Sequence, residues 1–427
     1  MKDKKFVGLI GIIATASSVV ALPVSGAGFQ ISEQTVAGMG QAFAGAGIAR
    51  DDASNVFYNP AGMLANPNRQ FQLGATLISA DAKFNNRGST QRLAGVAVPS
   101  SGPNSNGGDD SVVPNFYYTS SGDTFKWGLG VSAPYGLSTD YDNGWVGRYH
   151  ALFSELKTIN INPAVAVKVS ENVSIGAGVS ILKADAKISQ SVFTGPGRPD
   201  GKATLAGDDT EEAFNLGIMV TPTTSTRMGL GYRSSTRNRI EARVHFTGVP
   251  GVPASLPAES TITLPESVFA SLSHVFRGKT EVSGSLRWTR WSELPELRIS
   301  TAGLPDSVSD YQWEDVVMWS LGVNHQLNDT WMLRAGYAFD ESPVPSAANR
   351  SPRVPDSDRD WFTLGVSAKI SKTMRLDFSY ARVNGDKSDI NNTVNLVASA
   401  PGAFTDTLRG DYSSSVNLFG IQLYGEF

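Results

Sequence analysis

The chain has 427 residues, a formal net charge of -4 and no cysteine. The absence of cysteine excludes a disulfide framework and thiolate metal sites. The mild acidity argues against nucleic-acid binding, which requires a concentrated basic surface.

Residues 1–26 have the layout of a cleaved secretory signal peptide. Three lysines precede an apolar stretch over residues 6–21, and Val24 and Gly26 suit the −3 and −1 positions of a cleavage site. A transmembrane anchor is the alternative, but the stretch is short, contains Ser and Thr, and ends at Pro23. We therefore expect the mature chain to begin near Ala27, outside the cytoplasm.

Residues 27–68 show no alternation of apolar and polar positions. Gly and Ala crowd between charged residues such as Glu33, Asp51 and Asp52. Small residues allow close packing in a confined space, and the acidic pair can meet basic groups on a surrounding wall. We expect this segment to fold as a plug, or hatch, inside a barrel formed by residues 69–427. A loose periplasmic tail is the alternative.

From about residue 69 onward the chain reads as a series of β-strands. In 372–383, for example, apolar residues occupy the even positions 374–380 and polar residues the odd positions 375–379. This period of two with one wet face is typical of strands. The predicted strands, about fourteen in number, lie near 69–85, 111–121, 124–136, 154–170, 172–190, 210–222, 224–246, 261–277, 279–291, 315–327, 329–340, 358–370, 372–383 and 414–427.

The connections between these strands are short and long in turn. Turns of two or three residues alternate with long connections rich in Gly, Pro, Ser, Asn and Asp, at 86–110, 137–153, 191–209, 247–260, 292–314, 341–357 and 384–413. Tight periplasmic turns and long extracellular loops are typical of outer-membrane barrels. A soluble β-sandwich, the alternative, has no reason to sort its loops by length. We therefore predict an all-β transmembrane antiparallel barrel in the outer membrane of a Gram-negative bacterium.

The last predicted strand ends in an aromatic residue. Phe419, Ile421 and Phe427 share one face of this strand. A terminal Phe after an alternating strand resembles the C-terminal signal of outer-membrane proteins. Because unpaired strand edges cannot be satisfied in lipid, we expect this strand to close the barrel by pairing with the first strand near residues 71–77.

Several motifs resemble those of the FadL/TodX family of outer-membrane transporters of long-chain fatty acids and hydrophobic aromatic compounds. The motifs are Ala27-Gly28-Phe29-Gln30, Gly38-Met39-Gly40-Gln41-Ala42, Asp51-Asp52-Ala53-Ser54-Asn55, Asn59-Pro60-Ala61-Gly62, Pro134-Tyr135-Gly136-Leu137, Trp145-Val146-Gly147-Arg148-Tyr149 and Thr158-Ile159-Asn160-Ile161-Asn162-Pro163. They concentrate in residues 27–182, and the family's fourteen-stranded barrel with an N-terminal hatch agrees with the strand count.

The resemblance implies passive uptake of long-chain fatty acids or related hydrophobic compounds. Movement of the N-terminal end of the hatch would release the ligand through a lateral opening in the barrel wall. An aqueous pore would leave such a ligand fully hydrated, whereas a dry lateral exit would not. The resemblance assigns ligand contacts to Ala27, Gly28 and Phe29 at the tip of the hatch.

Two prolines are candidates for the gate. The resemblance places Asn59, Pro60 and Ala61 against the wall opening; the alternative is a plain turn between plug and barrel. Pro134 interrupts a strand-like run because proline cannot complete the ladder. It marks either a break in the third strand, which would serve as the exit, or simply the end of that strand.

Arginines supply candidate ligands for a carboxylate headgroup. If Met228 and Leu230 face lipid, alternation places an arginine row on the lumen face, at positions 227, 233, 237, 239 and 243. Arginine binds carboxylates bidentately and keeps its charge when partly buried. Arg233, Arg237 and Arg148 are the headgroup candidates, and the row favours fatty acids over aromatic hydrocarbons. Structural pairing with carboxylates of the plug or lumen is the alternative.

The sequence gives little support to catalysis. The four histidines form no catalytic triad or metal-ligand spacing, so we expect no enzyme activity, metal or cofactor. An outer-membrane lipase or deacylase is a minor alternative. A general porin, a surface adhesin and an aromatic hydrocarbon transporter are the alternative functions. As partners we expect a hydrophobic small molecule, outer-membrane lipid and lipopolysaccharide, and the barrel assembly machinery. We expect no nucleic acid and a monomeric state.

Overall fold

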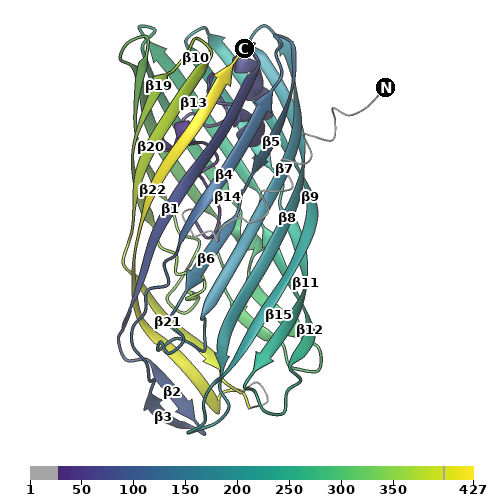
Figure 1. Cartoon of the computed structure of the whole chain (residues 1–427), viewed down its shortest axis with the longest axis vertical. Helices are drawn as coiled ribbons and strands as arrows, with labels where there is room; N and C mark the ends of the chain where they lie inside the picture. The colour runs from purple at the N-terminus through teal and green to yellow at the C-terminus, as the bar shows by residue number, and fades with distance from the viewer. Residues whose placement is uncertain (1–26, 398–399) are drawn as a thin grey trace.

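The computed structural model describes residues 27–397 and 400–427, so the expected signal peptide, residues 1–26, lies outside the described residues. The strands form a closed, antiparallel barrel of fourteen strands, which confirms the predicted fold class (Figure 1). The last strand pairs with the first as predicted: Phe71 lies opposite Gly425, and Leu77 opposite Phe419. No helix of the described part is long and apolar enough to cross a membrane.

Short helices precede the barrel, namely α2 (Val36–Met39), α3 (Asn55–Tyr58) and the 3-10 helix η1 (Pro60–Ala65). The strands, with the 3-10 helix η2 (Trp291–Glu293) among them, are β1 (Gln70–Asn86), β2 (Thr90–Leu93), β3 (Val96–Pro99), β4 (Asp110–Thr119), β5 (Phe125–Ser132), β6 (Gly136–Asp140), β7 (Phe153–Ser170), β8 (Val173–Val192), β9 (Gly201–Thr223), β10 (Thr226–Arg233), β11 (Thr236–Thr247), β12 (Ser255–Leu264), β13 (Ser267–Phe276), β14 (Thr280–Thr289), β15 (Glu296–Thr301), β16 (Ser307–Asp310), β17 (Val316–Gln326), β18 (Trp331–Asp340), β19 (Arg359–Lys369), β20 (Met374–Gly385), β21 (Ser388–Asn395) and β22 (Phe404–Glu426).

Several spanning strands consist of two elements separated by a short interruption, such as β5 and β6 or β10 and β11. Parts of the predicted long loops are also strand. β9 already begins at Gly201 and β22 at Phe404, about ten residues before the predicted starts. The alternating apolar pattern ends where the outer face leaves the hydrocarbon, whereas backbone pairing continues beyond it. Periodicity alone therefore placed these strand starts too late.

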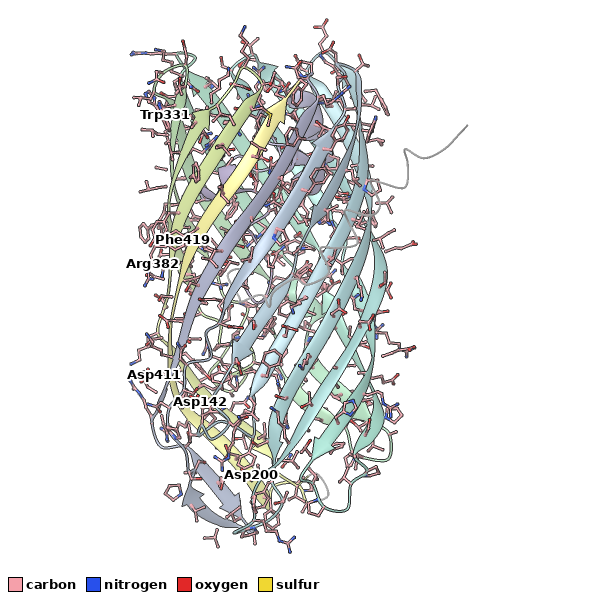
Figure 2. The ribbon with its side chains drawn as sticks, viewed as in Figure 1. Asp142, Asp200, Trp331, Arg382, Asp411 and Phe419 are labelled. Atoms are coloured by element: carbon pink, nitrogen blue, oxygen red, sulfur yellow. The ribbon has the colours of Figure 1, made fainter. Side chains whose placement is uncertain are left out.

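The outward side chains form an apolar band. Phe419 is 52% exposed and Leu364 63% exposed, although both are large and apolar. Figure 2 shows Trp331 near the end of the barrel that carries the short turns, then Phe419, then Arg382 further along the wall. Asp411, Asp142 and Asp200 follow toward the end that carries the long connections. This order of side chains is that of a wall crossing a membrane.

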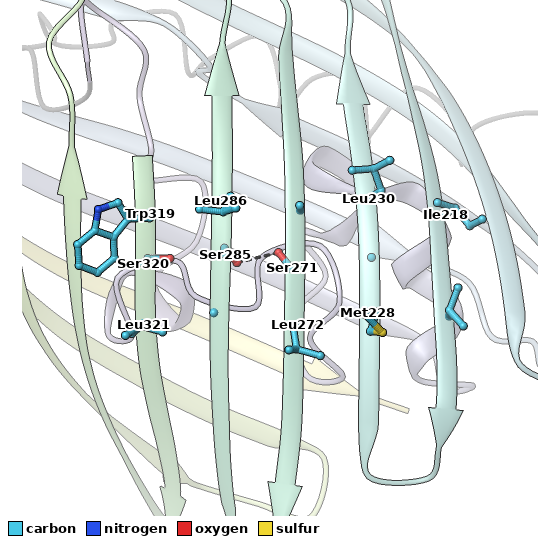
Figure 3. Close-up of a pocket in the computed structure, with 14 residues that line it drawn as sticks. Ile218, Met228, Leu230, Ser271, Leu272, Ser285, Leu286, Trp319, Ser320 and Leu321 are labelled. Carbon is cyan, nitrogen blue, oxygen red and sulfur yellow. Dashed lines mark hydrogen bonds between the residues drawn. The ribbon is translucent and has the colours of Figure 1, made fainter. Parts of the chain in front are cut away.

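A broad hollow of about 790 Å³ lies on this outer face, across β9, β10, β13, β14 and β17. Leu230, Leu272, Leu286 and Leu321 surround it (Figure 3), and Gly284 of β14 is also among its lining residues. Because its lining is the lipid-facing side of the wall, we do not assign it to ligand transport through the lumen.

Candidate functional site

The N-terminal segment, residues 27–68, lies inside the barrel near the end with the short turns (Figure 1). Several of the inward strand positions that it touches are glycine. A Cβ atom at Gly217 or Gly229 would overlap the side chain of Asn59, and one at Gly336 would overlap Gln41. Inward glycines in otherwise regular strands mark close approach of another backbone. They are the sequence signal that could have located these contacts.

Asn59 joins this segment to the wall. Its Oδ1 accepts a hydrogen bond from the Ala61 backbone nitrogen at 3.1 Å, which caps η1. Its Nδ2 donates to the carbonyl oxygen of Ile218 on β9 at 3.0 Å. Pro60 occupies the first turn of η1, where its missing N–H costs nothing. The predicted gating motif Asn59-Pro60-Ala61 therefore contacts β9. Pro134, the other predicted gating residue, contacts a different part of the N-terminal segment.

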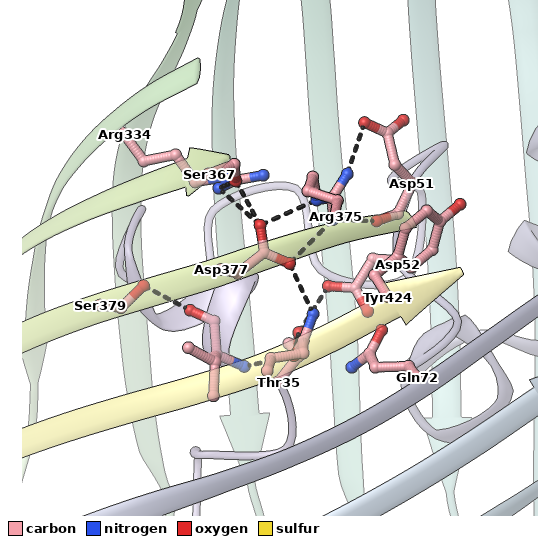
Figure 4. A network of polar contacts seen from close by, with 12 residues as sticks. Thr35, Asp51, Asp52, Gln72, Arg334, Ser367, Arg375, Asp377, Ser379 and Tyr424 are labelled. Atoms are coloured by element: carbon pink, nitrogen blue, oxygen red, sulfur yellow. Dashed lines mark hydrogen bonds and ion pairs between the residues drawn. The ribbon is translucent and has the colours of Figure 1, made fainter. Parts of the chain in front are cut away.

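A network of charges holds the other side of the segment (Figure 4). Arg375 of β20 donates to the Asp51 carboxylate at 3.2 Å and to the Asp51 carbonyl oxygen at 2.9 Å. Arg375 and Arg334 both pair with the buried Asp377. Gln422 of β22 donates to Asp377 at 3.1 Å and accepts from the backbone nitrogen of Val36 at 2.9 Å. The predicted contact of the acidic pair, Asp51 and Asp52, with basic groups on the surrounding wall is confirmed for Asp51.

The third spanning strand is interrupted at Pro134 and then resumes, because β5 ends at Ser132 and β6 begins at Gly136. The N-terminal segment pairs with the interruption. The Ile31 nitrogen donates to the Pro134 carbonyl oxygen at 2.9 Å, and the Gly136 nitrogen donates to the Phe29 carbonyl oxygen at 2.9 Å. The segment thus satisfies backbone groups that the neighbouring strand leaves unpaired.

That neighbouring strand, β4, pairs with β5 only over its last four residues, 116–119, opposite 128–131. β6 pairs with β7 on its other side, and no β4–β6 pairing occurs in the part of the chain that the structure describes. The barrel wall therefore has a gap in its hydrogen-bond ladder between β4 and β6. Residues 29–31 are placed at this gap.

The first described residues are held by buried carboxylates. The Ala27 nitrogen donates to Asp340 Oδ2 at 2.9 Å, and the Gly28 nitrogen donates to Asp356 Oδ2 at 3.1 Å. Arg359 lies 3.5 Å from the Asp340 carboxylate and 3.1 Å from that of Asp356. Burial raises the pKa of Asp356, and the Arg359 guanidinium opposes this shift.

Phe29 lies in a box of aromatic rings. Its ring centroid is 4.7 Å from that of Trp291, 5.8 Å from Trp313 and 6.2 Å from Tyr135. The indole N–H groups of Trp291 and Trp313 are buried and have no hydrogen-bond partner among the described residues. The two indole N–H groups therefore remain available as hydrogen-bond donors beside the Phe29 ring.

Beyond Phe29 lies an apolar pocket of about 60 Å³. Its apolar lining is Leu137, Leu156, Ile188, Leu205, Ile240, Ile262, Leu294, Leu297, Ile299 and Val354. Arg353 also lines this pocket, although it is only 4% exposed. The pocket thus combines a mainly apolar lining with one buried cation. Ser154, Glu155 and Ser260 also border it, and the Glu155 carboxylate is paired with Lys157 at 2.8 Å.

Arg353 has only neutral partners. It donates to Gln190 Oε1 at 2.6 Å and to Ser154 Oγ at 3.2 Å, and no described carboxylate forms an ion pair with it. Burial lowers its pKa, and the nearby tyrosines Tyr311 and Tyr141 oppose this shift. Sequence reasoning missed Arg353 because it lies in a connection, 341–357, that was expected to be an external loop. No periodicity in that connection indicates that it folds into the lumen.

The arginine row does not share one face. Arg233 is buried in the lumen, but Arg237, Arg239 and Arg243 are exposed on the outer face of β11. The prediction for Arg237 was wrong because β10 and β11 are separated at Ser234 and Ser235, which shifts the alternation by one residue.

The remaining headgroup candidates have other partners. Arg233 donates to the Phe57 carbonyl oxygen at 3.1 Å and stacks on the Phe57 ring at 4.1 Å. Arg148 pairs with Asp200 at 2.8 Å and donates to the Ser101 carbonyl oxygen at 2.6 Å. Arg148 thus has a carboxylate partner, as in the structural alternative, whereas Arg233 is held by neutral oxygen atoms and the Phe57 ring.

The comparisons with known proteins agree with this geometry. Residues 17–427 match the family model described as outer membrane protein transport protein (OMPP1/FadL/TodX). The chain belongs to this family. Its family and its barrel place this protein in the outer membrane, as predicted. The members are transport proteins, and no described group of carboxylates and histidines could hold a metal ion.

Relatives match over nearly the whole chain. Outer membrane protein P1 of Haemophilus influenzae is 27% identical and covers 97% of this chain and 98% of its own. The long-chain fatty acid transport protein of Escherichia coli K12 is 27% identical, with 89% and 92% covered. The structure of a Pseudomonas aeruginosa FadL homologue superimposes with a TM-score of 0.85 at 23% identity, covering 94% of this chain and all of that one. The Pseudomonas putida toluene transporter TodX gives 0.68 at 16% identity, with 91% and 99% covered.

Proposed function

We propose that this protein carries long-chain fatty acids across the outer membrane by passive uptake. The observation that carries the proposal is Arg353, a buried cation without a carboxylate partner at the edge of an apolar pocket. A buried charge without an ionic partner is costly. A fatty acid would supply the missing carboxylate and place its chain against the apolar lining. The names of relatives such as the Escherichia coli long-chain fatty acid transport protein support this substrate class.

In this proposal residues 27–68 are the hatch of the barrel, residues 69–427, and residues 1–26 are a signal peptide. A ligand chain that enters the pocket displaces Phe29, which closes one side of it. Because residues 29 and 31 also pair with the interruption at Pro134, their displacement opens the gap between β4 and β6. The ligand then leaves sideways into the bilayer without entering water. Asn59 and Pro60 hold the base of the hatch against β9 meanwhile.

The second candidate function is transport of aromatic hydrocarbons. The aromatic box around Phe29 favours it, since flat rings pack well against Trp291 and Trp313. The fold similarity to the toluene transporter TodX is compatible with it but concerns the fold alone. A hydrocarbon would leave Arg353 without an ionic partner and the two indole N–H groups without acceptors, which favours the fatty acid.

Uptake of labelled oleate and labelled toluene separates the two functions. Cells that lack their own transporter would express the wild type, Arg353→Gln, or the exposed-loop control Arg198→Gln. We expect Arg353→Gln to reduce oleate uptake about tenfold, as expected for one lost charge-assisted hydrogen bond, and to leave toluene unchanged. Toluene uptake with no oleate uptake in the wild type would establish the second function. Equal oleate uptake by all three proteins would contradict the role of Arg353.

A further inference from the structure

The outer wall beyond the apolar band carries charges in rows. Asp185 of β8 lies opposite Asp208 of β9, Asp208 lies opposite Glu241 of β11, and Glu241 lies opposite Glu259 of β12. All four side chains point outward by strand alternation. Like charges directly opposite on neighbouring strands destabilise a sheet. Lys183 pairs with Asp185 at 3.1 Å and with Asp208 at 3.5 Å, whereas Glu241 and Glu259 form no ion pair among the described residues. Such a row therefore suits a surface that meets further cations.

Rows of basic residues lie on both sides of the acidic row. On the far side Lys187 lies opposite Ala206, which lies opposite Arg243. On the side of the membrane Lys183 lies opposite Thr210, and Arg239 lies opposite Thr261. The outer surface of these strands thus alternates positive, negative and positive along the barrel axis.

At Arg239 the basic row on the membrane side borders a polar groove of about 630 Å³ on the outer surface of the barrel. Its charged lining is Arg237, Arg239, Arg298, Glu259, Glu293 and Glu296, with the hydroxyls of Thr261 and Thr263 between them. The groove exists because the ninth spanning strand is interrupted after β14. Trp291 and Leu294 turn into the lumen there and are buried, which hollows the outer side.

The arginines of β11 are available to a partner. Arg298 is engaged with Glu296 at 2.7 Å and Asp306 at 3.0 Å. Arg237, Arg239 and Arg243 are exposed, and within the described residues their side chains form no ion pair. Among the described residues, the guanidinium groups of these three arginines make one hydrogen bond to another side chain, from Arg243 to Ser255 at 3.2 Å.

The height of the groove matches the polar part of the outer leaflet. The outward Tyr232 on β10 closes the apolar band on this side, and Arg237 follows it by five residues. Five residues of a strand span at most about 17 Å, and less along the axis of a tilted strand. The arginines of β11 therefore begin, at Arg237, at the depth where acyl chains give way to headgroups, and they extend beyond the headgroups.

We propose that this outer face binds the phosphorylated inner region of lipopolysaccharide. The arginines of β11 contact its phosphates, which they match bidentately, and the threonine hydroxyls donate further hydrogen bonds. The acidic row faces the divalent cations that bridge these phosphates. A partner that carries both phosphate and bridging cations complements alternating rows, whereas a purely anionic lipid would be repelled by the acidic row. The inference concerns the outer wall and does not depend on the substrate.

The test is the amount of lipopolysaccharide that remains bound when the full protein is purified from outer membranes, measured by native mass spectrometry. Two host strains would make lipopolysaccharide with or without inner-core phosphate. The test variant is Arg237→Ser/Arg239→Ser/Arg243→Ser. The control is Arg382→Ser, an outward arginine on β20 that donates to Asn417 at 3.1 Å. Heat-modifiable mobility on a gel would show that each variant is folded.

We expect the triple variant to retain about tenfold less phosphorylated lipopolysaccharide than the wild type, and the control to retain a normal amount. Lipopolysaccharide without inner-core phosphate should bind the wild type as weakly as it binds the triple variant. Equal retention by the triple variant, or no preference of the wild type for phosphate, would overturn the proposal. Displacement of lipopolysaccharide by inorganic phosphate or phosphatidylglycerol vesicles would overturn it too, since the face would then bind anions in general.

Discussion

The backbone nitrogen of Ala27 lies 2.9 Å from Asp340 Oδ2, and the Asp340 side chain is wholly buried in the lumen. Arg287 and Arg359 each approach the same carboxylate at 3.5 Å. If the signal peptide is removed before Ala27, this nitrogen becomes an α-ammonium group and the contact becomes an ion pair. The N-terminal end of the proposed hatch would then be tied to the wall by its own terminal charge.

Asp340→Asn should loosen this tie with little change of shape. A hydrogen bond to a charged group contributes roughly 1.5–3 kcal/mol, so the local opening of residues 27–31 should become at least about tenfold more frequent. Hydrogen exchange of the Gln30 and Ile31 amides, which donate to the carbonyl oxygens of Ala27 and Pro134, measures this opening directly. Asp200→Asn, which alters an ion pair in an outer loop, is the control. Unchanged protection in Asp340→Asn would show that other contacts hold the tip.

A methyl group on the inner wall should displace the proposed hatch. In Gly217→Ala the added Cβ would overlap Asn59, and overpacking of this kind typically costs about 1–3 kcal/mol. We expect ion conductance through single barrels in planar bilayers to rise, because a displaced hatch leaves part of the lumen open. Gly284→Ala is the matched control, since its Cβ would point outward and come within ordinary distance, 3.4 Å, of Leu321. Equal conductance in both variants would contradict close packing at Asn59.

The sequence predicted those parts of the fold that depend on alternation and on turn length. The pairing of Phe71 with Gly425 is one example, because both strands keep a strict period of two. The predicted orientation of Arg237 was wrong, because the two residues between β10 and β11 move the odd positions from the lumen face to the outer face. Arg353 was also missed, because nothing local to the connection 341–357 records that it folds inward. Strand interruptions and connections that fold into the lumen arise from long-range packing, which alternation along the chain does not show. The candidate site consists largely of such segments.

Removing Arg375 should destabilise the barrel far more than removing a surface arginine. Arg375→Gln leaves the buried Asp377 with Arg334 as its cationic partner and frees Asp51. Breaking a buried pair typically costs about 3–5 kcal/mol. Arg290→Gln removes exposed ion pairs with Glu266 and Glu293, so we expect a much smaller loss of stability, because surface pairs in water contribute little. Urea unfolding of both variants in lipid vesicles, followed by tryptophan fluorescence, measures the difference. Similar midpoints would mean that water reaches the Asp377 network.

A reversible cross-link should lock the proposed gate. Gln30 and Tyr135 face each other in an isolated antiparallel bridge, between the hydrogen bonds that join residue 29 to 136 and 31 to 134. Cα atoms of such non-hydrogen-bonded pairs are about 4.5 Å apart, within the range of a disulfide. Because the chain has no cysteine, Gln30→Cys/Tyr135→Cys would introduce a single defined pair. We expect oxidation to stop oleate uptake and reduction to restore it.

Two sets of controls make the cross-link specific to the gate. Ser174→Cys/Met219→Cys joins two inward positions of β8 and β9, which are already paired within the wall, so its oxidation should leave uptake unchanged. The single variants Gln30→Cys and Tyr135→Cys separate the loss of side-chain contacts from the cross-link itself. If the oxidised Gln30→Cys/Tyr135→Cys protein still takes up oleate at the rate of its reduced form, residues 29–31 do not move away from Pro134 during transport. The ligand would then have to leave the lumen elsewhere than between β4 and β6.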